Sequence, residues 1–169
     1  MTLPGNKKII CITGTVWTYG TDAPRHQLIG NGFVRPTWFT TGRRITDAHY
    51  MRITTGGFHL ACAKDEVLAY IKYGSDFIGI SYQDMKQAID QSTLGVLVVG
   101  PQNLVVQIAE KLPQTMIFTF KEGEMMLSSE LNDAQRRGQV RRIDINTQQS
   151  NAWHQVTHTI LEYCMQSGY

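Results

Sequence analysis

Three short apolar runs constrain the fold of this sequence more than any other feature. They span residues 7–13 (KKIICIT), 95–100 (GVLVVG) and 115–121 (TMIFTFK). Each run has the length of a strand, and its adjacent apolar residues are typical of a strand that is buried on both faces of a sheet. Because helix-like segments alternate with such runs towards both ends of the chain, the sequence predicts an α/β protein with a parallel sheet and helices on both faces.

The expected helices begin and end at residues with recognisable capping chemistry. The side chains of Asp22 and Ser81 can accept a hydrogen bond from a free helix amide, so each is expected to be an N-cap. Pro24 and Pro101 suit the first turn of a helix, and Gly138 suits the position just after its end. Helices are therefore expected over residues 22–29, 82–91, 101–112, 124–137 and 151–165, with a last short strand at 142–146.

The middle of the chain is richer in strands and less regular than the two ends. Strands are expected over 33–40, 49–54, 67–73 and 76–81, and the last two should form a hairpin around Gly74 and Ser75. Gly56 and Gly57 are expected to break the chain after the second of these strands. The sequence thus predicts a single domain over 1–169, with a core formed by 1–32 and 82–169 and a small strand-rich subdomain inserted at 33–81.

The composition excludes several classes of protein. A net charge of +2 over 169 residues is too small to indicate binding to nucleic acid or to an anionic membrane. No run approaches the ~18 apolar residues of a membrane-spanning helix, and no secretory signal peptide is visible. The 3 cysteines are widely spaced and odd in number, so a disulfide framework is not expected. These features favour a cytoplasmic globular protein.

The first apolar run leads into a segment that begins like a phosphate-binding loop, ICITGTVWTYGTDAP. Such a loop ends in a lysine that contacts the phosphates and in a serine or threonine that contacts Mg²⁺. Here Gly14 and Gly20 are followed by Thr21 and Asp22, so the lysine is missing and a carboxylate replaces the hydroxyl. We therefore expect a capped turn without a phosphate site. The alternative is that Arg25, one turn later, replaces the lysine.

Five segments, in their order and spacing, carry a resemblance to a known family. They read ICITG, TTGRRITDAHYMRIT, GSDFIGIS, VLVVGPQNL and RIDINTQQSNAWHQVTHTIL. Together they cover nearly the whole chain, which resembles guanylate kinase and its relative, the ribose-bisphosphate kinase of phosphonate metabolism. The resemblance implies a parallel-sheet P-loop nucleoside monophosphate kinase-like core. It also implies transfer of the terminal phosphoryl group of ATP to a monophosphate, with Mg²⁺ and arginines stabilising the developing charge.

The resemblance further implies an anion site for the monophosphate in the inserted subdomain. The positions that match the family's motifs, or lie next to them, are Thr41, Arg43, Arg44, Tyr50, Gly79 and Ser81. Gly42 stands where the first arginine of the family belongs, and isoleucines replace the tyrosine and the threonine of the Tyr-Gly-Thr-Ser motif. Two plainer interpretations stay open. Arg43 and Arg44 could form a solvated basic turn, and Tyr50 could be an ordinary sheet tyrosine.

Two further departures concern the metal site and the lid of the family. Residues 98–100 (VVG) stand where guanylate kinases carry an aspartate that helps to organise the metal, and their side chains offer none of the oxygen ligands that Mg²⁺ prefers. The family's lid has two arginine-bearing helical segments, whereas only 122–142 is available here. Its basic residues, Arg136, Arg137, Arg141 and Arg142, are either remnants of the lid or cations that favour a helix C-terminus and a solvated face.

Three functional hypotheses follow from these comparisons. The first, which the combined losses favour, is a guanylate kinase-like protein that has lost ATP-dependent phosphoryl transfer and acts as a ligand-binding or protein-binding regulatory module, in other words a pseudokinase. The second is an active nucleoside or sugar monophosphate kinase with a non-standard phosphate loop. The third is a different enzyme that reuses the same cleft, with Asp22, Asp47, Asp76 or a histidine as its acid or base.

The expected ligands follow from the first hypothesis. They are a purine monophosphate or another phosphorylated molecule, and a protein partner is the further expectation. No cofactor is predicted, and Mg-ATP belongs only to the second hypothesis. No metal site is predicted either, because His154 and His158 have the spacing of a zinc-protease helix without the glutamate that such a helix requires.

Overall fold

The computed structural model describes residues 7–13, 28–43, 49–121, 128–144 and 152–166, and within these ranges the central sheet has five parallel strands. Their order across the sheet is β2-β7-β1-β8-β9. The bounds are Lys8–Thr13 for β1, Phe33–Val34 for β2, Gly95–Val99 for β7, Thr115–Lys121 for β8 and Val140–Asp144 for β9. The three apolar runs of the sequence therefore lie side by side at the centre, as expected for a sheet covered on both faces.

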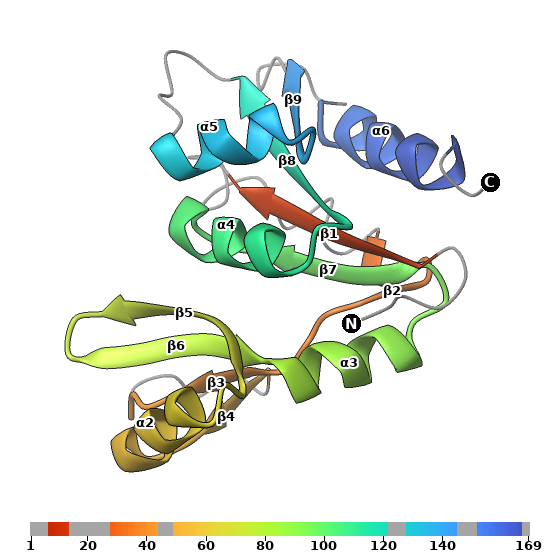
Figure 1. Ribbon diagram of the computed structural model, residues 1–169. Helices are drawn as coiled ribbons and strands as arrows, with labels where there is room; N and C mark the ends of the chain where they lie inside the picture. Colours follow the sequence, from red (N-terminus) through yellow and green to blue (C-terminus); the bar gives the residue numbers. More distant parts are fainter. Residues whose placement is uncertain (1–6, 14–27, 44–48, 122–127, 145–151, 167–169) are drawn as a thin grey trace.

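Helices cover both faces of this sheet (Figure 1). One face packs against α3 (Tyr82–Gln91), α4 (Gln102–Lys111) and α5 (Ser129–Arg136), and the other packs against α6 (Ala152–Gln166). Successive residues of β1 explain why both faces are apolar. Ile9 and Cys11 belong to the cluster with α4, whereas Ile10 and Ile12 belong to the cluster with α6, and all four side chains are fully buried.

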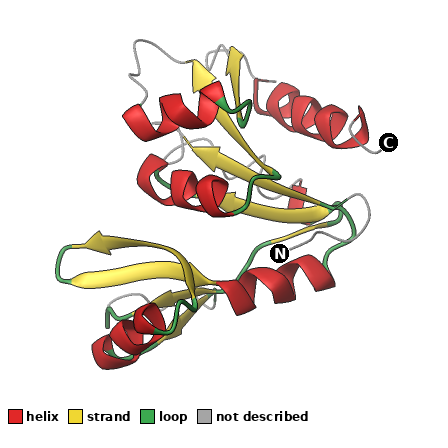
Figure 2. Cartoon of the chain, in the orientation of Figure 1, coloured by secondary structure: helices red, strands yellow, loops and turns green. Residues whose placement is uncertain are grey.

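A second, four-stranded sheet is inserted between β2 and α3 (Figure 2). Its order is β4-β3-β6-β5, with parallel pairing between β3 and β4 and antiparallel pairing elsewhere. The bounds are Trp38–Thr40 for β3, Tyr50–Arg52 for β4, Val67–Tyr73 for β5 and Asp76–Ser81 for β6. The helix α2 (Thr55–Ala63) lies on the side of this sheet that faces away from the core.

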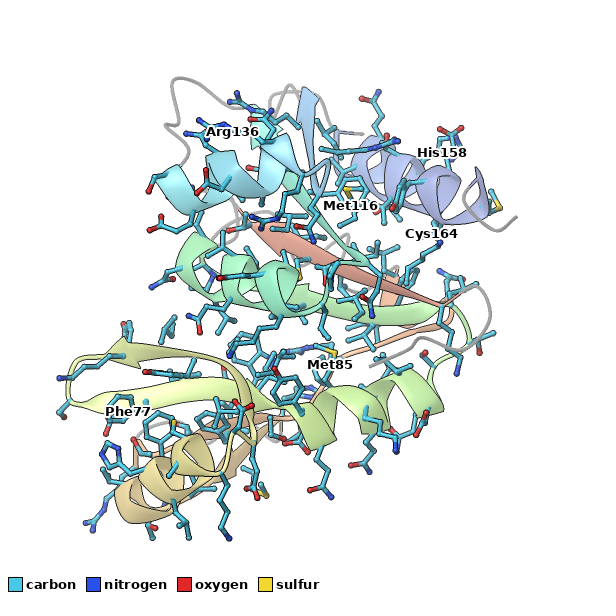
Figure 3. The ribbon with its side chains drawn as sticks, viewed as in Figure 1. Phe77, Met85, Met116, Arg136, His158 and Cys164 are labelled. Atoms are coloured by element: carbon cyan, nitrogen blue, oxygen red, sulfur yellow. The ribbon has the colours of Figure 1, made fainter. Side chains whose placement is uncertain are left out.

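The two faces of the inserted sheet have different neighbours. Towards α2, Phe39, Phe58 and Phe77 form an aromatic cluster, in which the rings of Phe58 and Phe77 stack with centroids 4.3 Å apart. Towards the core, the apolar side chains of the insertion belong to the same buried cluster as those of β1, β7 and α4. Figure 3 shows side chains, including that of Met85, filling the space between these layers. The hydrophobic core is therefore continuous across the junction.

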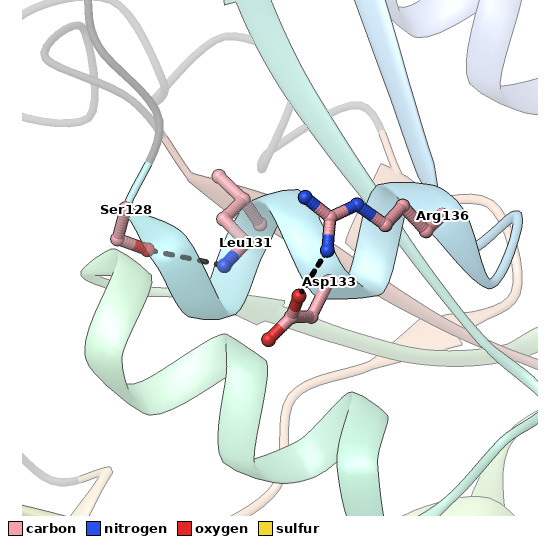
Figure 4. A network of polar contacts seen from close by, with 4 residues as sticks. All are labelled: Ser128, Leu131, Asp133 and Arg136. Carbon is pink, nitrogen blue, oxygen red and sulfur yellow. Dashed lines mark hydrogen bonds and ion pairs between the residues drawn. The ribbon is translucent and has the colours of Figure 1, made fainter.

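Most of the expected elements are confirmed, with small changes at their ends. The hairpin of β5 and β6 turns at Gly74, which has φ +65°, and Ser81 caps α3 by accepting a hydrogen bond from the amide of Asp84 at 3.0 Å. Gly138 follows α5 with φ +78°, a conformation that favours glycine. Ser128 caps α5 by accepting a hydrogen bond from the amide of Leu131 (Figure 4). The expected helix over 124–137 is thus described only from this cap onwards.

Two expectations about local structure are wrong. Gly56 and Gly57 do not break the chain, because they lie in the first turn of α2, where Thr54 accepts a hydrogen bond from the amide of Gly57 at 2.9 Å. The single strand expected over 33–40 is two strands. Of these, Phe33–Val34 pairs with β7 in the central sheet and Trp38–Thr40 belongs to the insertion. In the first case the N-cap at Thr54 outweighs the tendency of glycine to break a helix. In the second case Pro36 interrupts the run of strand-forming residues.

No helix within the described ranges is long and apolar enough to cross a membrane.

Candidate functional site

A cavity of about 460 Å³ lies where the inserted sheet faces the end of β7 and the start of α4. Parallel α/β sheets bind ligands at the carboxyl ends of their strands, and this cavity lies at the carboxyl end of β7. We refer to it as the cleft cavity. Its lining residues are Trp38, Tyr50, Ile71, Lys72, Tyr73, Ile78, Val99, Gly100, Pro101 and Asn103. Aromatic and aliphatic residues predominate among these described residues, and none of them is a carboxylate.

Trp38 forms the buried part of this cavity. Its side chain is only 8% exposed, and its ring centroid lies 5.9 Å from that of Tyr50, with the two planes tilted by 52°. The far edge of the indole reaches Gly100 of the core, where an added Cβ atom would lie 3.3 Å from the Cη2 atom of Trp38. Trp38 therefore bridges the insertion and the core, and Tyr50 packs beside it.

A second cavity, of about 600 Å³, adjoins the first and carries an arginine, and we refer to it as the Arg43 cavity. It is lined by Thr41, Gly42, Arg43, Tyr73, Gly74, Ser75, Asp76 and Ile78. Tyr73 and Ile78 line both cavities, so the aromatic cavity and the charged cavity share part of a wall. The guanidinium of Arg43 can hold an anion there, although Asp76 contributes the opposite charge on the same wall.

Arg52 is a residue of this region that the sequence analysis did not single out. It donates a hydrogen bond from Nη2 to the backbone carbonyl of Arg43 at 3.0 Å. Both arginines also line a third cavity, of about 680 Å³, together with Thr41 and the residues that start α2. The alternation of β4 was the available signal, because Tyr50 and Arg52 are two residues apart and so share one face of the strand.

The remaining matches to the family's motifs have structural partners. The Thr41 hydroxyl accepts a hydrogen bond from the amide of Phe77 at 2.9 Å, which ties β3 to β6. The Ser81 hydroxyl caps α3. A Cβ atom on Gly79 would lie 2.3 Å from the backbone oxygen of Ala69, so this position must be glycine for the sheet to pack. The structure thus gives Thr41, Gly79 and Ser81 a role in holding the site's walls.

The four arginines near the expected lid do not converge on these cavities. Arg136 pairs with Asp133 at 3.0 Å on the exposed face of α5 (Figure 4), and Arg137 donates to the side chain of Gln139 at 2.8 Å. Arg141 lies over the ring of Tyr163 in α6, with 4.8 Å between its Cζ atom and the centroid. Arg142 is exposed on β9. None of the four lines the three cavities described above.

Several predicted residues lie outside the described ranges. They are Gly14, Gly20, Thr21, Asp22 and Arg25 of the phosphate-loop segment, and Arg44 of the anion site. The prediction of a degenerate phosphate loop therefore remains a prediction from sequence.

Two buried hydroxyls stand at the carboxyl edge of the central sheet, just before the phosphate-loop segment. Thr13 ends β1 and pairs in register with Thr119, which lies in β8, and their side chains are 1% and 0% exposed. Among the described residues, neither hydroxyl has a hydrogen-bond partner. Sequence reasoning missed this pair, because it depends on strand register.

The shifted pKa values belong to residues outside the three cavities. Burial raises the pKa of Cys11 far above its ordinary range and that of Cys164 to about 11. Burial also raises the pKa of Tyr163, and the neighbouring Arg141 partly offsets this effect. No group of three or more His, Cys, Asp or Glu side chains within the described ranges is placed to hold a metal ion.

Comparison with solved structures shows that the chain has a guanylate kinase-like fold. The crystal structure of guanylate kinase from Anaplasma phagocytophilum superposes with a TM-score of 0.61, covering 98% of this chain and 88% of that chain at 13% sequence identity. No protein-family model matches the sequence, and no curated protein matches it. At an identity this low the comparison shows the fold, whereas the activity depends on the individual residues of the site.

Proposed function

We propose that this protein binds a phosphorylated ligand with a planar ring and has lost the transfer of a phosphoryl group from ATP to that ligand. The observation that supports this is the junction between the cleft cavity and the Arg43 cavity, which share Tyr73 and Ile78. An aromatic cavity accommodates a planar ring, and a guanidinium at the adjoining end pairs with phosphate. A purine monophosphate combines these two features, and so do other phosphorylated aromatic molecules.

The lining of the cleft and the sequence of the loop both disfavour phosphoryl transfer. Transfer from ATP requires Mg²⁺, which prefers carboxylate, phosphate and water oxygens. Among the described residues, the core wall of the cleft is formed by Val99, Gly100, Pro101 and Asn103, and none of these supplies a carboxylate. The loop sequence also lacks the lysine that would contact the phosphates. Because these groups act together in the transition state, their combined loss should leave little activity. The protein would then act as a regulatory, pseudokinase-type binding module.

Thermal unfolding with candidate ligands tests this proposal. We would add GMP, AMP, GDP, inorganic phosphate or Mg-ATP, each at millimolar concentration. A ligand at about 100 times its Kd stabilises the folded state by ~2.7 kcal/mol, which raises the Tm of a domain of this size by a few degrees. We expect such a shift with at least one monophosphate, and no transfer of phosphate from Mg-ATP to GMP or AMP.

Two matched arginine variants locate the binding. Arg43→Met keeps the length of the side chain and removes its charge, so it should abolish the shift. Arg136→Met makes the same change on the exposed face of α5, away from the cavities, and should leave the shift intact. Phosphate transfer from Mg-ATP would instead support the active-kinase alternative. No shift with any of the five compounds would overturn the proposed ligand class and favour a protein-binding role.

A further inference from the structure

One residue of α4 completes the outer edge of the inserted sheet. β5 is an edge strand, so the backbone groups that point away from β6 need other partners. The side chain of Gln107 supplies both partners for Tyr70. Its Oε1 atom accepts from the Tyr70 amide at 3.1 Å, and its Nε2 atom donates to the Tyr70 carbonyl at 2.7 Å. The amide group thus substitutes for a neighbouring strand.

The next turn of α4 holds the start of the same strand. Lys111 donates from Nζ to the carbonyl of Leu68 at 2.7 Å and lies 3.4 Å from that of Val67. Gln107 and Lys111 are four residues apart, so they project from the same face of the helix. A third bond, from Nε2 of Gln107 to the carbonyl of Asn103 at 2.8 Å, keeps the Gln107 side chain aligned along α4. Two side chains of α4 therefore hold β5 at two positions, Tyr70 and Leu68.

The same helix forms the opposite wall of the cleft cavity. Asn103 lies in the first turn of α4, and Ile71 and Tyr73 belong to β5 and come after Tyr70. All three residues line the cleft cavity. Moving β5 away from Gln107 and Lys111 would therefore change the width of the cavity itself.

Buried apolar contacts also hold the insertion on the core. Trp38, Leu68 and Ile80 of the insertion are 8%, 0% and 0% exposed, and they share one cluster with side chains of the core. Strand β6 also runs into α3 without an intervening loop, because Ser81 ends the strand and caps the helix. Rotation of the insertion would expose this cluster to water, which is unfavourable for apolar side chains.

We infer that Gln107 and Lys111 are positioning residues that hold the inserted sheet on the core, so that the cleft keeps one width whether or not a ligand is bound. A cleft of this kind binds without the subdomain closure that many enzymes use to exclude water during catalysis. It avoids the entropic cost of ordering on binding, because the walls are already in place. The inference goes beyond the proposed function, since it applies to the protein alone.

The distance between insertion and core tests this inference directly. We would place spin labels at Leu60→Cys in α2 and Met165→Cys in α6, whose native side chains are 56% and 69% exposed. Cys62 and Cys164 would be replaced by serine and alanine to restrict labelling. Double electron–electron resonance then gives the distribution of label distances. For the protein alone we expect one narrow peak, unchanged in position and width when GMP, phosphate or Mg-ATP is added.

Variants of the two residues separate positioning from general stability. Gln107→Glu keeps the shape and the acceptor for the Tyr70 amide, but it places a carboxylate against the Tyr70 carbonyl. Lys111→Met keeps the length and removes the donor, whereas Lys111→Arg keeps a donor. We expect the distance distribution to broaden at least twofold in the Gln107→Glu/Lys111→Met protein. It should narrow again when the methionine is replaced by arginine.

Each outcome has a definite meaning. A broad or two-peaked distribution in the parent protein, or a peak that moves on adding Mg-ATP or GMP, would overturn the inference. A double variant with the parent's narrow peak would also overturn it, because other contacts would then suffice. Should the double variant fail to give a single thermal transition, Gln107→Glu alone is measured by the same criterion. Failure of all ligands to raise the Tm would contradict only the proposed function.

Discussion

The indole ring of Trp38 packs against Gly100 so closely that an added Cβ atom would lie 3.3 Å from its Cη2 atom. The same Cβ atom would lie 3.1 Å from Cδ2 of Leu104. Trp38 starts β3 in the insertion, whereas Gly100 follows β7 in the core. The join between the two sheets therefore depends on a position without a side chain.

Enlarging Gly100 should disturb this join. Gly100→Val should lower the free energy of unfolding by about 1–3 kcal/mol, because overpacking forces neighbouring side chains out of their preferred rotamers. Urea denaturation measures this change, and Gly100→Ala, which adds less volume, should cost less. Equal stability of the valine variant and the parent would show that Trp38 does not pack against this position.

Two glycines should respond to alanine in opposite directions. A Cβ atom on Gly79 would lie 2.3 Å from the Ala69 carbonyl oxygen, which is backbone and cannot rotate away, so Gly79→Ala should destabilise strongly or prevent folding. A Cβ atom on Gly56 in α2 would meet nothing within 4 Å. Gly56→Ala should raise the free energy of unfolding by about 0.5–1 kcal/mol, because glycine is costly inside a helix. Thermal melts of both variants test the pair, and a stable Gly79→Ala protein would contradict the packing of β5 on β6.

Removing the Ser81 hydroxyl should cost stability and leave ligand binding unchanged. Ser81 accepts a hydrogen bond from the amide of Asp84, and loss of such a cap costs ~1 kcal/mol. Ser128→Ala, which removes the equivalent cap of α5, should cost a similar amount and serves as the control. The Tm and the ligand-induced shift are measured together. If the ligand no longer raised the Tm of Ser81→Ala but still raised that of Ser128→Ala, Ser81 would be part of the anion site.

Replacing Thr119 by valine should not destabilise the protein. Its hydroxyl is fully buried and has no partner among the described residues, so Thr119→Val removes an unsatisfied polar group. The expected gain is about 1 kcal/mol in the free energy of unfolding. Thr40→Val is the matched control, because the Thr40 hydroxyl accepts a hydrogen bond from the amide of Gly42 at 3.0 Å and its loss should destabilise. A destabilised Thr119→Val protein would show that its hydroxyl has a partner in solution.

Stability should decline in alkaline solution because of a buried thiol. Burial raises the pKa of Cys164 from 9.0 to about 11. The unfolded chain therefore loses this proton near pH 9, whereas the folded chain keeps it until about pH 11. The free energy of unfolding should fall across this interval by up to about 2 kcal/mol from this group.

A cysteine variant isolates that contribution. Cys164→Ala should be less stable than the parent at neutral pH, because it loses buried volume, and the difference should shrink as the pH rises above 9. Urea denaturation at several pH values measures the difference. A difference that does not change with pH would show that Cys164 does not titrate on unfolding.

The sequence predicted the elements whose signals are local. The apolar runs, the hairpin at Gly74 and the cap at Ser81 depend on residues a few positions apart, and the structure confirms them. The error at Gly56 and Gly57 has a local cause as well, because the cap at Thr54 outweighs the low helix propensity of glycine. The resemblance also gave the correct fold.

The candidate site was less predictable, because its geometry depends on contacts between distant segments. Thr41, Arg43 and Tyr50 were named together from a motif, yet Arg43 and Tyr50 line different, adjoining cavities. The contact between Arg52 and Arg43 depends on the pairing of β4 with β3, which the sequence alone does not give. Gln107 belongs to no recognisable motif, because its role depends on how closely α4 approaches β5.

Local chemistry within the sequence thus determined which segments form strands and helices and where several of them begin and end, since hydrophobic period, caps and turn residues act over a few positions. Only the tertiary structure decided which side chains meet at the cleft. Strand register brings Thr13 and Thr119 together. Trp38 meets Gly100, and Tyr70 meets Gln107, where the insertion packs on the core. Such contacts depend on how whole layers of helices and strands pack together. Only a few arrangements of these layers bury all of their apolar faces.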